Sequence, residues 1–467
     1  MFSKYLESKH DLCKELLSRL VDKYPYVSIL GKHVTGDSVR VSTFNTTVGD
    51  TMEKQCGFVV KIYNGKSYSE YSFSDITRES IDKIERDILE KTKLSEELLN
   101  NHVDGKVIPD VPLKQDFFRE REGGTYSIEE VVNKLTGYKN LVHSKNDKVL
   151  QVFSIYENYE VSSFFISKNR DLRQNYPWTM AVVVVVVRDG NKVQNARQVS
   201  VGINADKIFA DLESKLDSTI NLAIELLGAT MIEPGEYEII TNPSITGLIA
   251  HEAFGHGVEM DMFVKHRARA RNYVGKQVAS PLVEMHDGAA AADSVASYFF
   301  DDDGVLAHDT LIIKDGILQT GISDVISAMQ LGTEPTGNGR RESYKRKAYT
   351  RMTNTFFARG TSKLEDMIKS VKHGYMLFET NNGMEDPKNW NIQCTAEYGR
   401  EIKDGKFTGK IVAPVVMSGY VPDLLMSISA VSDDFEVIGA GHCGKGHKEW
   451  VPVSDGGPCL KARCKLS

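Results

Sequence analysis

The chain has 467 residues, of which 41% are apolar, 26% charged and 9% aromatic, as in ordinary globular proteins. This composition excludes an intrinsically disordered chain and a bundle of membrane helices. The 57 basic and 64 acidic residues give a net charge of −7, so no overall positive field favours nucleic acid as a partner.

The first half of the chain alternates predicted helices and strands. Apolar residues at helical spacing predict helices over about 3–22, 81–89 and 206–227. Ser127 and Glu130 have the spacing of a capping box. Segments rich in Val, Phe and Tyr predict strands between about 27 and 73, and over 149–168 and 178–203.

Several features of the sequence indicate where in the cell the protein is expected. The longest apolar run, Ala181–Val187, is far shorter than the roughly 20 residues of a membrane span, so it predicts a buried strand and no membrane contact. The segment Met1–His10 lacks the apolar stretch of a secretory signal, and the six cysteines include no Cys-x-x-Cys pair. We therefore expect a cytoplasmic protein in a reducing compartment.

The second half begins after Pro234 and Gly235, which follow the long predicted helix. A strand over 236–241 precedes a short helix for which Ser244 is the expected N-cap, and mostly strands follow. Asp-Gly pairs at 315–316 and 404–405 predict hairpin turns. We expect an α+β fold, with an N-terminal α/β domain over 1–230 and a β-rich C-terminal domain over 231–467.

The short helix contains the sequence His-Glu-Ala-Phe-Gly-His, from His251 to His256. Histidines five residues apart lie about 140° from each other on a regular α-helix, too far to share a metal ion. A single π-type turn of about 4.4 residues brings them to about 50°, and Gly255 is the residue expected to tolerate it. Glu252 would then lie beside the ion as a base. The alternative is a chance pairing on a surface helix.

A third metal ligand is expected from the glycine-rich segment Gly439–His447, which contains Cys443. Two histidines and one thiolate leave the fourth position of a catalytic zinc ion open for water. By itself the segment is more typical of a glycine-rich loop around a buried thiol. His442, His447 and Glu259 are rival ligands.

Four motifs together resemble the TldD branch of the TldD/PmbA (TldE) family of metallopeptidases. They are His251–His256, Pro335–Tyr344, Thr350–Thr355 and Gly441–Lys445. Thr350 departs from the family pattern, which has proline before the Arg-Met-Thr-Asn run. The first 230 residues fit only by general layout.

The resemblance implies a zinc-dependent peptidase with one ion per subunit, held by His251, His256 and Cys443, with Glu252 as catalytic base. It also implies flexible or unfolded peptides as substrates. The partner subunit would be a second copy or a metal-less paralogue, and the pair would enclose the active site. The alternative function is a regulatory binding protein with a structural metal, since the family was once described as modulating DNA gyrase.

Three other charged features call for an interpretation. Arg340, Arg341 and Arg351 are candidates to bind a substrate carboxylate, and structural ion pairing is the alternative. Alternating arginines in the basic run Phe263–Arg271 favour a solvated or substrate-facing strand over a nucleic-acid site. The segment Asp301–Gly304 lacks the later ligands of a calcium loop and predicts a turn.

Overall fold

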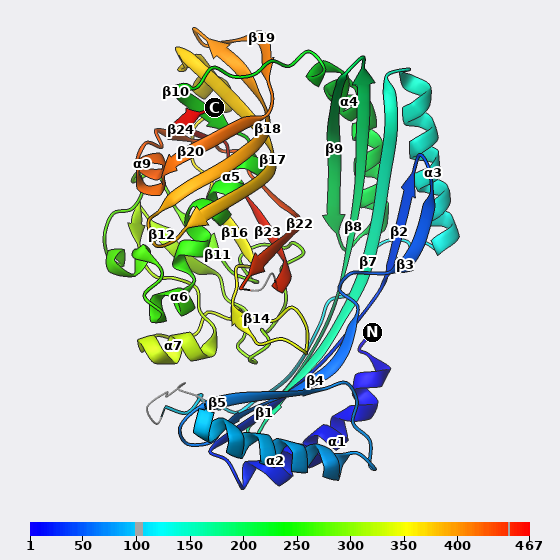
Figure 1. The fold of residues 1–467 in the computed structure, drawn as a ribbon, viewed down its shortest axis with the longest axis vertical. Coiled ribbons are helices and arrows are strands. Elements are labelled where there is room, and N and C mark those ends of the chain that lie inside the picture. Colours follow the sequence, from blue (N-terminus) through cyan, green and yellow to red (C-terminus); the bar gives the residue numbers. More distant parts are fainter. Residues whose placement is uncertain (99–105, 447–448) are drawn as a thin grey trace.

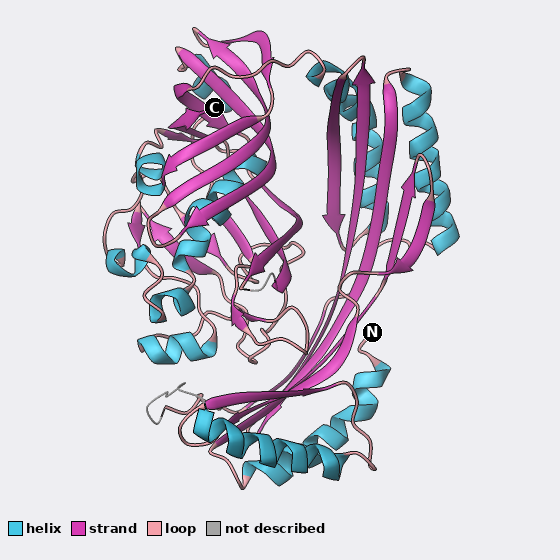
Figure 2. Ribbon diagram, in the orientation of Figure 1, coloured by secondary structure: helices cyan, strands magenta, loops and turns pink. Residues whose placement is uncertain are grey.

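The computed structural model describes residues 1–98, 106–446 and 449–467. Nine strands of its first half form one sheet, in which every pairing is antiparallel except that of β6 with β8. β7 and β8 have 19 and 20 residues and pair along nearly their whole length, so they run through the N-terminal half from end to end (Figures 1 and 2). The nine strands are β1 (Tyr26–Thr35), β2 (Asp37–Ser42), β3 (Thr46–Asp50), β4 (Gln55–Tyr63), β5 (Tyr68–Phe73), β6 (Leu113–Phe118), β7 (Val149–Ser167), β8 (Arg170–Asp189) and β9 (Lys192–Gly202).

Four helices cover this sheet at two places (Figure 1). Near one end lie α1 (Lys4–Val21) and α2 (Ile81–Leu98), and near the other lie α3 (Ile128–Lys145) and α4 (Ala205–Leu226). Alternate residues of β8 point to the α3–α4 side and are fully buried there, namely Ala181, Val183, Val185 and Val187. The buried strand, the helices and the capping box of Ser127 with Glu130 are thus confirmed.

The second half contains a closed barrel. β10 pairs with β17, and the ladder continues through β18, β20 and β24 back to β10. Its strands and the two attached to it are β10 (Gly235–Thr241), β17 (His373–Asp386), β18 (Asn391–Lys403), β19 (Lys406–Val412), β20 (Val415–Tyr420), β21 (Ala430–Val431) and β24 (Leu460–Leu466). The Asp404–Gly405 turn joins β18 to β19 as predicted, with positive φ at both residues.

A six-stranded sheet and short helices complete this half. The sheet has the order β13-β12-β11-β16-β23-β22, and a separate two-stranded ladder joins β14 to β15. These strands are β11 (Met285–Asp287), β12 (Thr310–Lys314), β13 (Ile317–Leu318), β14 (Gly339–Arg340), β15 (Tyr349–Thr350), β16 (Asn354–Phe357), β22 (Glu436–Lys445) and β23 (Glu449–Gly457). The helices are α5 (Pro243–Leu248), α6 (Met260–Val264), α7 (Val325–Leu331), α8 (Leu364–Lys369) and α9 (Val421–Met426).

The two halves share no sheet among the described residues. Strands of the first sheet end at Gly202, and those of the other sheets begin at Gly235. The division into two domains near residue 230 is compatible with these bounds and stays our proposal. Partly buried ion pairs cross between the halves, including Lys32 with Asp302 at 3.1 Å. The α+β class is confirmed. In the described part of the chain no helix is long and apolar enough to cross a membrane.

Three local predictions are wrong. Asn242, not Ser244, caps α5, because Pro243 takes the first helical position. The Asn242 side-chain oxygen accepts a hydrogen bond from the Ile245 N–H at 3.0 Å. The arginines of the basic run lie partly in a 3-10 turn, Arg269–Tyr273, instead of a strand. The segment expected to be a glycine-rich loop is mostly strand β22, which pairs with β23.

Candidate metal centre

The turn that carries the two histidines is a π-helix. It spans Ile249–Gly255 (η1), between α5 and a 3-10 turn at His256–Val258 (η2). The π geometry predicted from the spacing is therefore confirmed. Gly255 itself has an ordinary helical φ of −59°, but an added Cβ would lie 2.2 Å from the Met352 sulfur. Glycine is needed here for close packing and not for backbone freedom.

His251, His256 and Cys443 converge on one point. Their donor atoms lie within 4.8 Å of one another, and His256 Nε2 is 3.5 Å from Cys443 Sγ. A tetrahedral zinc ion with ordinary bond lengths separates such atoms by about 3.6 Å. Nδ1 of His251 is buried and has no hydrogen-bond partner among the residues that the structure describes. The donor set fits zinc, and the described residues contain no other group of this kind.

The charges of these side chains depend on one another. Burial would raise the pKa of the Cys443 thiol, but the imidazoles of His256 and His251 lower it well below its usual range. Burial opposes a charged His256, yet Cys443 and Glu259 raise the pKa of His256 well above its usual value. The site therefore stabilises a thiolate next to positive charge, which is also the state in which cysteine binds a metal.

Glu259 supports His256 from the side away from Cys443. Its Oε2 lies 3.3 Å from His256 Nδ1, while His256 Nε2 faces the sulfur. Lys445 holds this carboxylate at 3.0 Å and contacts Asp261 at 2.7 Å. Burial acts to raise the pKa of Glu259, but Lys445 and His256 lower it to about 2. Glu259 thus contacts the outer nitrogen of His256 and lies outside the donor group. The sequence analysis assigned no role to Lys445 or Asp261.

The other rival ligands do not join this group. His442 Nε2 lies 2.8 Å from Glu53 of the first half, because neighbouring residues of a strand point to opposite faces and Cys443 takes the face toward the histidines. His447 lies outside the described residues. Three protein donors are therefore what the described chain offers.

Three further carboxylates lie around the donors. Glu252 Oε2 is 3.9 Å from His256 Nε2, its side chain is 18% exposed, and burial raises its pKa. Gly383 of β17 packs on it, since a Cβ there would lie 2.6 Å from Glu252 Cγ. Burial raises the pKa of Asp455 to about 6 and that of Glu385 well above its usual range. No local pattern marks Glu385 or Asp455, because strands far along the chain bring them here.

The three candidate substrate arginines are buried, with exposures of 8%, 3% and 0% for Arg340, Arg341 and Arg351. Arg340 donates to two backbone carbonyls at 2.7 Å, and Arg341 binds Glu70 at 3.1 Å. Arg351 donates to the carbonyl of Cys443. These contacts correspond to the alternative given above, in which the arginines stabilise the fold. They leave few N–H donors for a substrate carboxylate.

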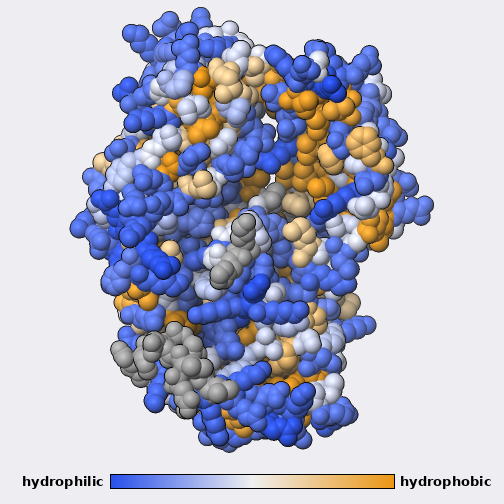
Figure 3. Space-filling view, in the orientation of Figure 1, coloured by the Kyte–Doolittle hydropathy of each residue, from blue (hydrophilic) through white to orange (hydrophobic). Residues whose placement is uncertain are grey.

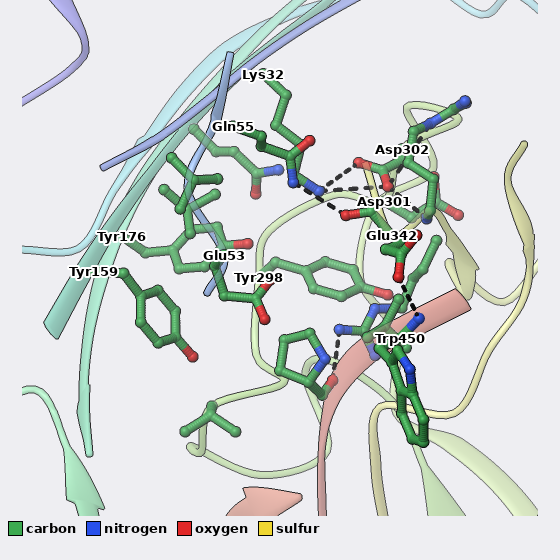
Figure 4. Close-up of a pocket in the computed structure, with 18 of the residues that line it drawn as sticks. Lys32, Glu53, Gln55, Tyr159, Tyr176, Tyr298, Asp301, Asp302, Glu342 and Trp450 are labelled. Carbon is green, nitrogen blue, oxygen red and sulfur yellow. Dashed lines mark hydrogen bonds and ion pairs between the residues drawn. The ribbon is translucent and has the colours of Figure 1, made fainter. Parts of the chain in front are cut away.

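A small cavity of about 50 Å³ lies beside Arg340, between the first sheet and the loops of the second half (Figure 4). Tyr159 and Tyr176 of the long strands line it opposite Tyr298, and Lys32 with Asp302 closes one end. None of the three metal donors lines this cavity, so it is separate from the metal centre.

Comparisons with known proteins identify relatives of this chain. Residues 234–463 match the family model described as the PmbA/TldA metallopeptidase C-terminal domain. A metalloprotease of Methanothermobacter thermautotrophicus is 30% identical over 320 residues, which are 68% of this chain and 69% of that protein. The chain belongs to the PmbA/TldD family.

One further sequence relative and one solved structure are also similar to this chain. The zinc metalloprotease TldD homolog of Saccharolobus solfataricus is 26% identical, over 76% of this chain and 79% of that protein. The crystal structure of TldE from Thermococcus kodakarensis has a TM-score of 0.76 at 17% identity and covers 97% of this chain and 99% of its own. The fold is thus that of the family, and the names of the relatives support a metallopeptidase function.

Proposed function

We propose that the protein is a zinc-dependent peptidase of the TldD branch, with Glu252 as its base. The observation that carries this proposal is the convergence of His251, His256 and Cys443, with Glu252 3.9 Å from a ligand nitrogen. Three protein donors are the number that catalytic zinc sites use, whereas structural sites use four. The regulatory alternative needs a fourth donor that the described residues do not supply.

The metal ion and the side chains of the protein would contribute different parts of the reaction. When bound, zinc would polarise the scissile carbonyl and acidify a water. Glu252 takes the water proton and passes it to the leaving amine, and a pKa raised by burial suits a group that does both. Glu259 and Lys445 hold the His256 ring in place during this transfer.

The substrate is an extended, flexible peptide. Along Asn382–Asp386, β17 pairs with β18 on one side, and no described strand pairs with its other edge. Gly383 lies in this stretch and touches Glu252, so a peptide added along the edge would pass the base. Main-chain hydrogen bonds would then give affinity with little demand on side chains, and a folded domain could not enter.

Two subunits would enclose the site, either as a homodimer or with a metal-less paralogue. Figure 3 shows a hollow between the two halves and an apolar area over the strands on one side of it. Leu150, Phe153 and Val193 of β7 and β9 are 44%, 40% and 52% exposed. An apolar area of this kind marks an interaction surface on many proteins. A fully active monomer in light scattering would exclude the enclosure.

The test is Glu252→Gln, which removes the base and keeps every metal donor. We expect the rate of hydrolysis of an unstructured peptide to fall by about 10²–10⁴-fold, with metal content unchanged. Glu129→Gln on exposed α3 is the matched control and should behave as wild type. Wild-type activity of the Glu252 variant would rule out this residue as the base. Absence of metal-dependent hydrolysis by the wild-type protein would instead favour the regulatory alternative.

A further inference from the structure

A second polar pocket lies beyond the metal helix. The chain turns at His266, where φ is +53°, and continues into the 3-10 turn Arg269–Tyr273. Together with the turn between β17 and β18, this segment borders a cavity of about 300 Å³. The lining residues are His266, Ala268, Arg269, Arg271, Asn272 and Lys388. No acidic side chain is among them.

In the described part of the chain, no carboxylate pairs with the cations of this pocket. Among the described residues, Arg269, Arg271 and Lys388 form no ion pair, whereas Lys265 just before them pairs with Asp261 at 3.1 Å. Asp386 turns its carboxylate to the backbone N–H groups of Lys388 and Asn389 and does not line the cavity. Like charges gathered without a counter-charge repel one another, so a bound anion would stabilise this pocket.

The two arginines are already held in position. The Arg269 guanidinium lies 5.5 Å from the ring of Trp390 and 5.6 Å from that of Tyr420. Arg271 donates to the carbonyl of Phe263 at 3.1 Å, and its Nη1 is 2.6 Å from His266 Nδ1. Fixed guanidinium groups present paired N–H donors that match the geometry of an oxyanion.

We propose that this pocket binds an oxyanion of the phosphate class, either free or carried as a phosphoryl group on a peptide. A phosphate has enough charge and enough acceptor oxygens for both guanidinium groups and the Lys388 ammonium. The cations gather in one pocket instead of forming a stripe along which a nucleic-acid backbone could lie. The site contains none of the metal donors, so it does not depend on the proposed peptidase function.

The test compares two double variants that each remove two positive charges. R269Q/R271Q changes the pocket, and K406Q/K410Q changes exposed lysines on β19 as a matched control. Inorganic phosphate and a serine-phosphorylated peptide are titrated into each metal-loaded protein by calorimetry at constant ionic strength. We expect saturable binding to wild type and to the control, and about tenfold or greater weakening in R269Q/R271Q.

Two further measurements distinguish a free oxyanion from a phosphoryl group on a peptide and provide a second pocket variant. Equal affinities for phosphate and phosphopeptide support a free ion, whereas tighter binding of the phosphopeptide supports a phosphoryl group on a chain. Lys388→Gln, on an exposed turn, repeats the test if the double variant does not fold. The proposal is overturned if wild type does not saturate, if binding is insensitive to these pocket variants, or if single-stranded DNA binds more tightly than the phosphopeptide.

Discussion

Two buried charged clusters of this protein differ in where their positive charge comes from. The cluster between the halves contains Glu70, Asp302 and Asp303, and the protein supplies its cations as Lys61 and Arg341. The metal centre gathers electron-pair donors around one point, with Nδ1 of His251 unpartnered. Burial of charge alone therefore does not mark a functional site. Donors that converge on one point, where a bound metal would take the place of the imidazole proton, indicate a metal site.

The largest expected effect is the loss of the metal itself. Cys443→Ser replaces a thiolate by a weakly binding hydroxyl, so we expect metal affinity to fall by more than the roughly 100-fold that outer-sphere changes cost. Activity should fall with it. Metal analysis after dialysis measures this effect, and Cys13→Ser, which changes a buried thiol of α1 far from the donors, is the control. Equal metal content in both variants would show that Cys443 is not a ligand.

The cluster between the halves should respond in stability and not in metal binding. Arg341→Met leaves Glu70 and Asp302 without their guanidinium partner, and breaking a buried pair costs about 3–5 kcal/mol. Arg346→Met is a matched control, because Arg346 is half exposed and its pair with Glu342 is worth about 0–1 kcal/mol. Urea unfolding gives both values. An Arg341 variant that loses metal but keeps full stability would contradict the distinction between the cluster between the halves and the metal centre.

The smallest expected effect comes from the support of a ligand. Glu259→Gln keeps a side chain of the same size but removes the charge between His256 and Lys445. We expect metal affinity to fall by about 10–100-fold, as for other outer-sphere substitutions. Competition with a chelator of known affinity measures the change. A fall as large as that of Cys443→Ser would instead make Glu259 a direct ligand.

The sequence predicts the centre better than its surroundings, for a physical reason. Spacing along one helix is local, so the interval between His251 and His256 was enough to predict the π-turn. The support of His256 by Glu259 and Lys445 joins the residue before α6 to β22, and neither segment has a local sequence pattern that indicates the other. The buried arginines show the same limit, because their partners come from distant strands.

The errors in the fold were local and had local causes. Pro243 moved the helix cap to Asn242. The glycine-rich segment up to Lys445 is extended because Gly441 and Gly444 pair with β23. The helices and long strands of the first half carried their periodicity over many residues, so their prediction from the sequence alone succeeded.

The central claim is that two histidines and one cysteine hold a zinc ion whose fourth position is open. X-ray absorption at the zinc edge of the loaded protein tests it directly. The structure predicts one sulfur at about 2.3 Å and three nitrogen or oxygen neighbours at about 2.0–2.1 Å, with the sulfur lost in Cys443→Ser. A zinc spectrum without sulfur, or one that the Cys443 substitution leaves unchanged, would contradict it.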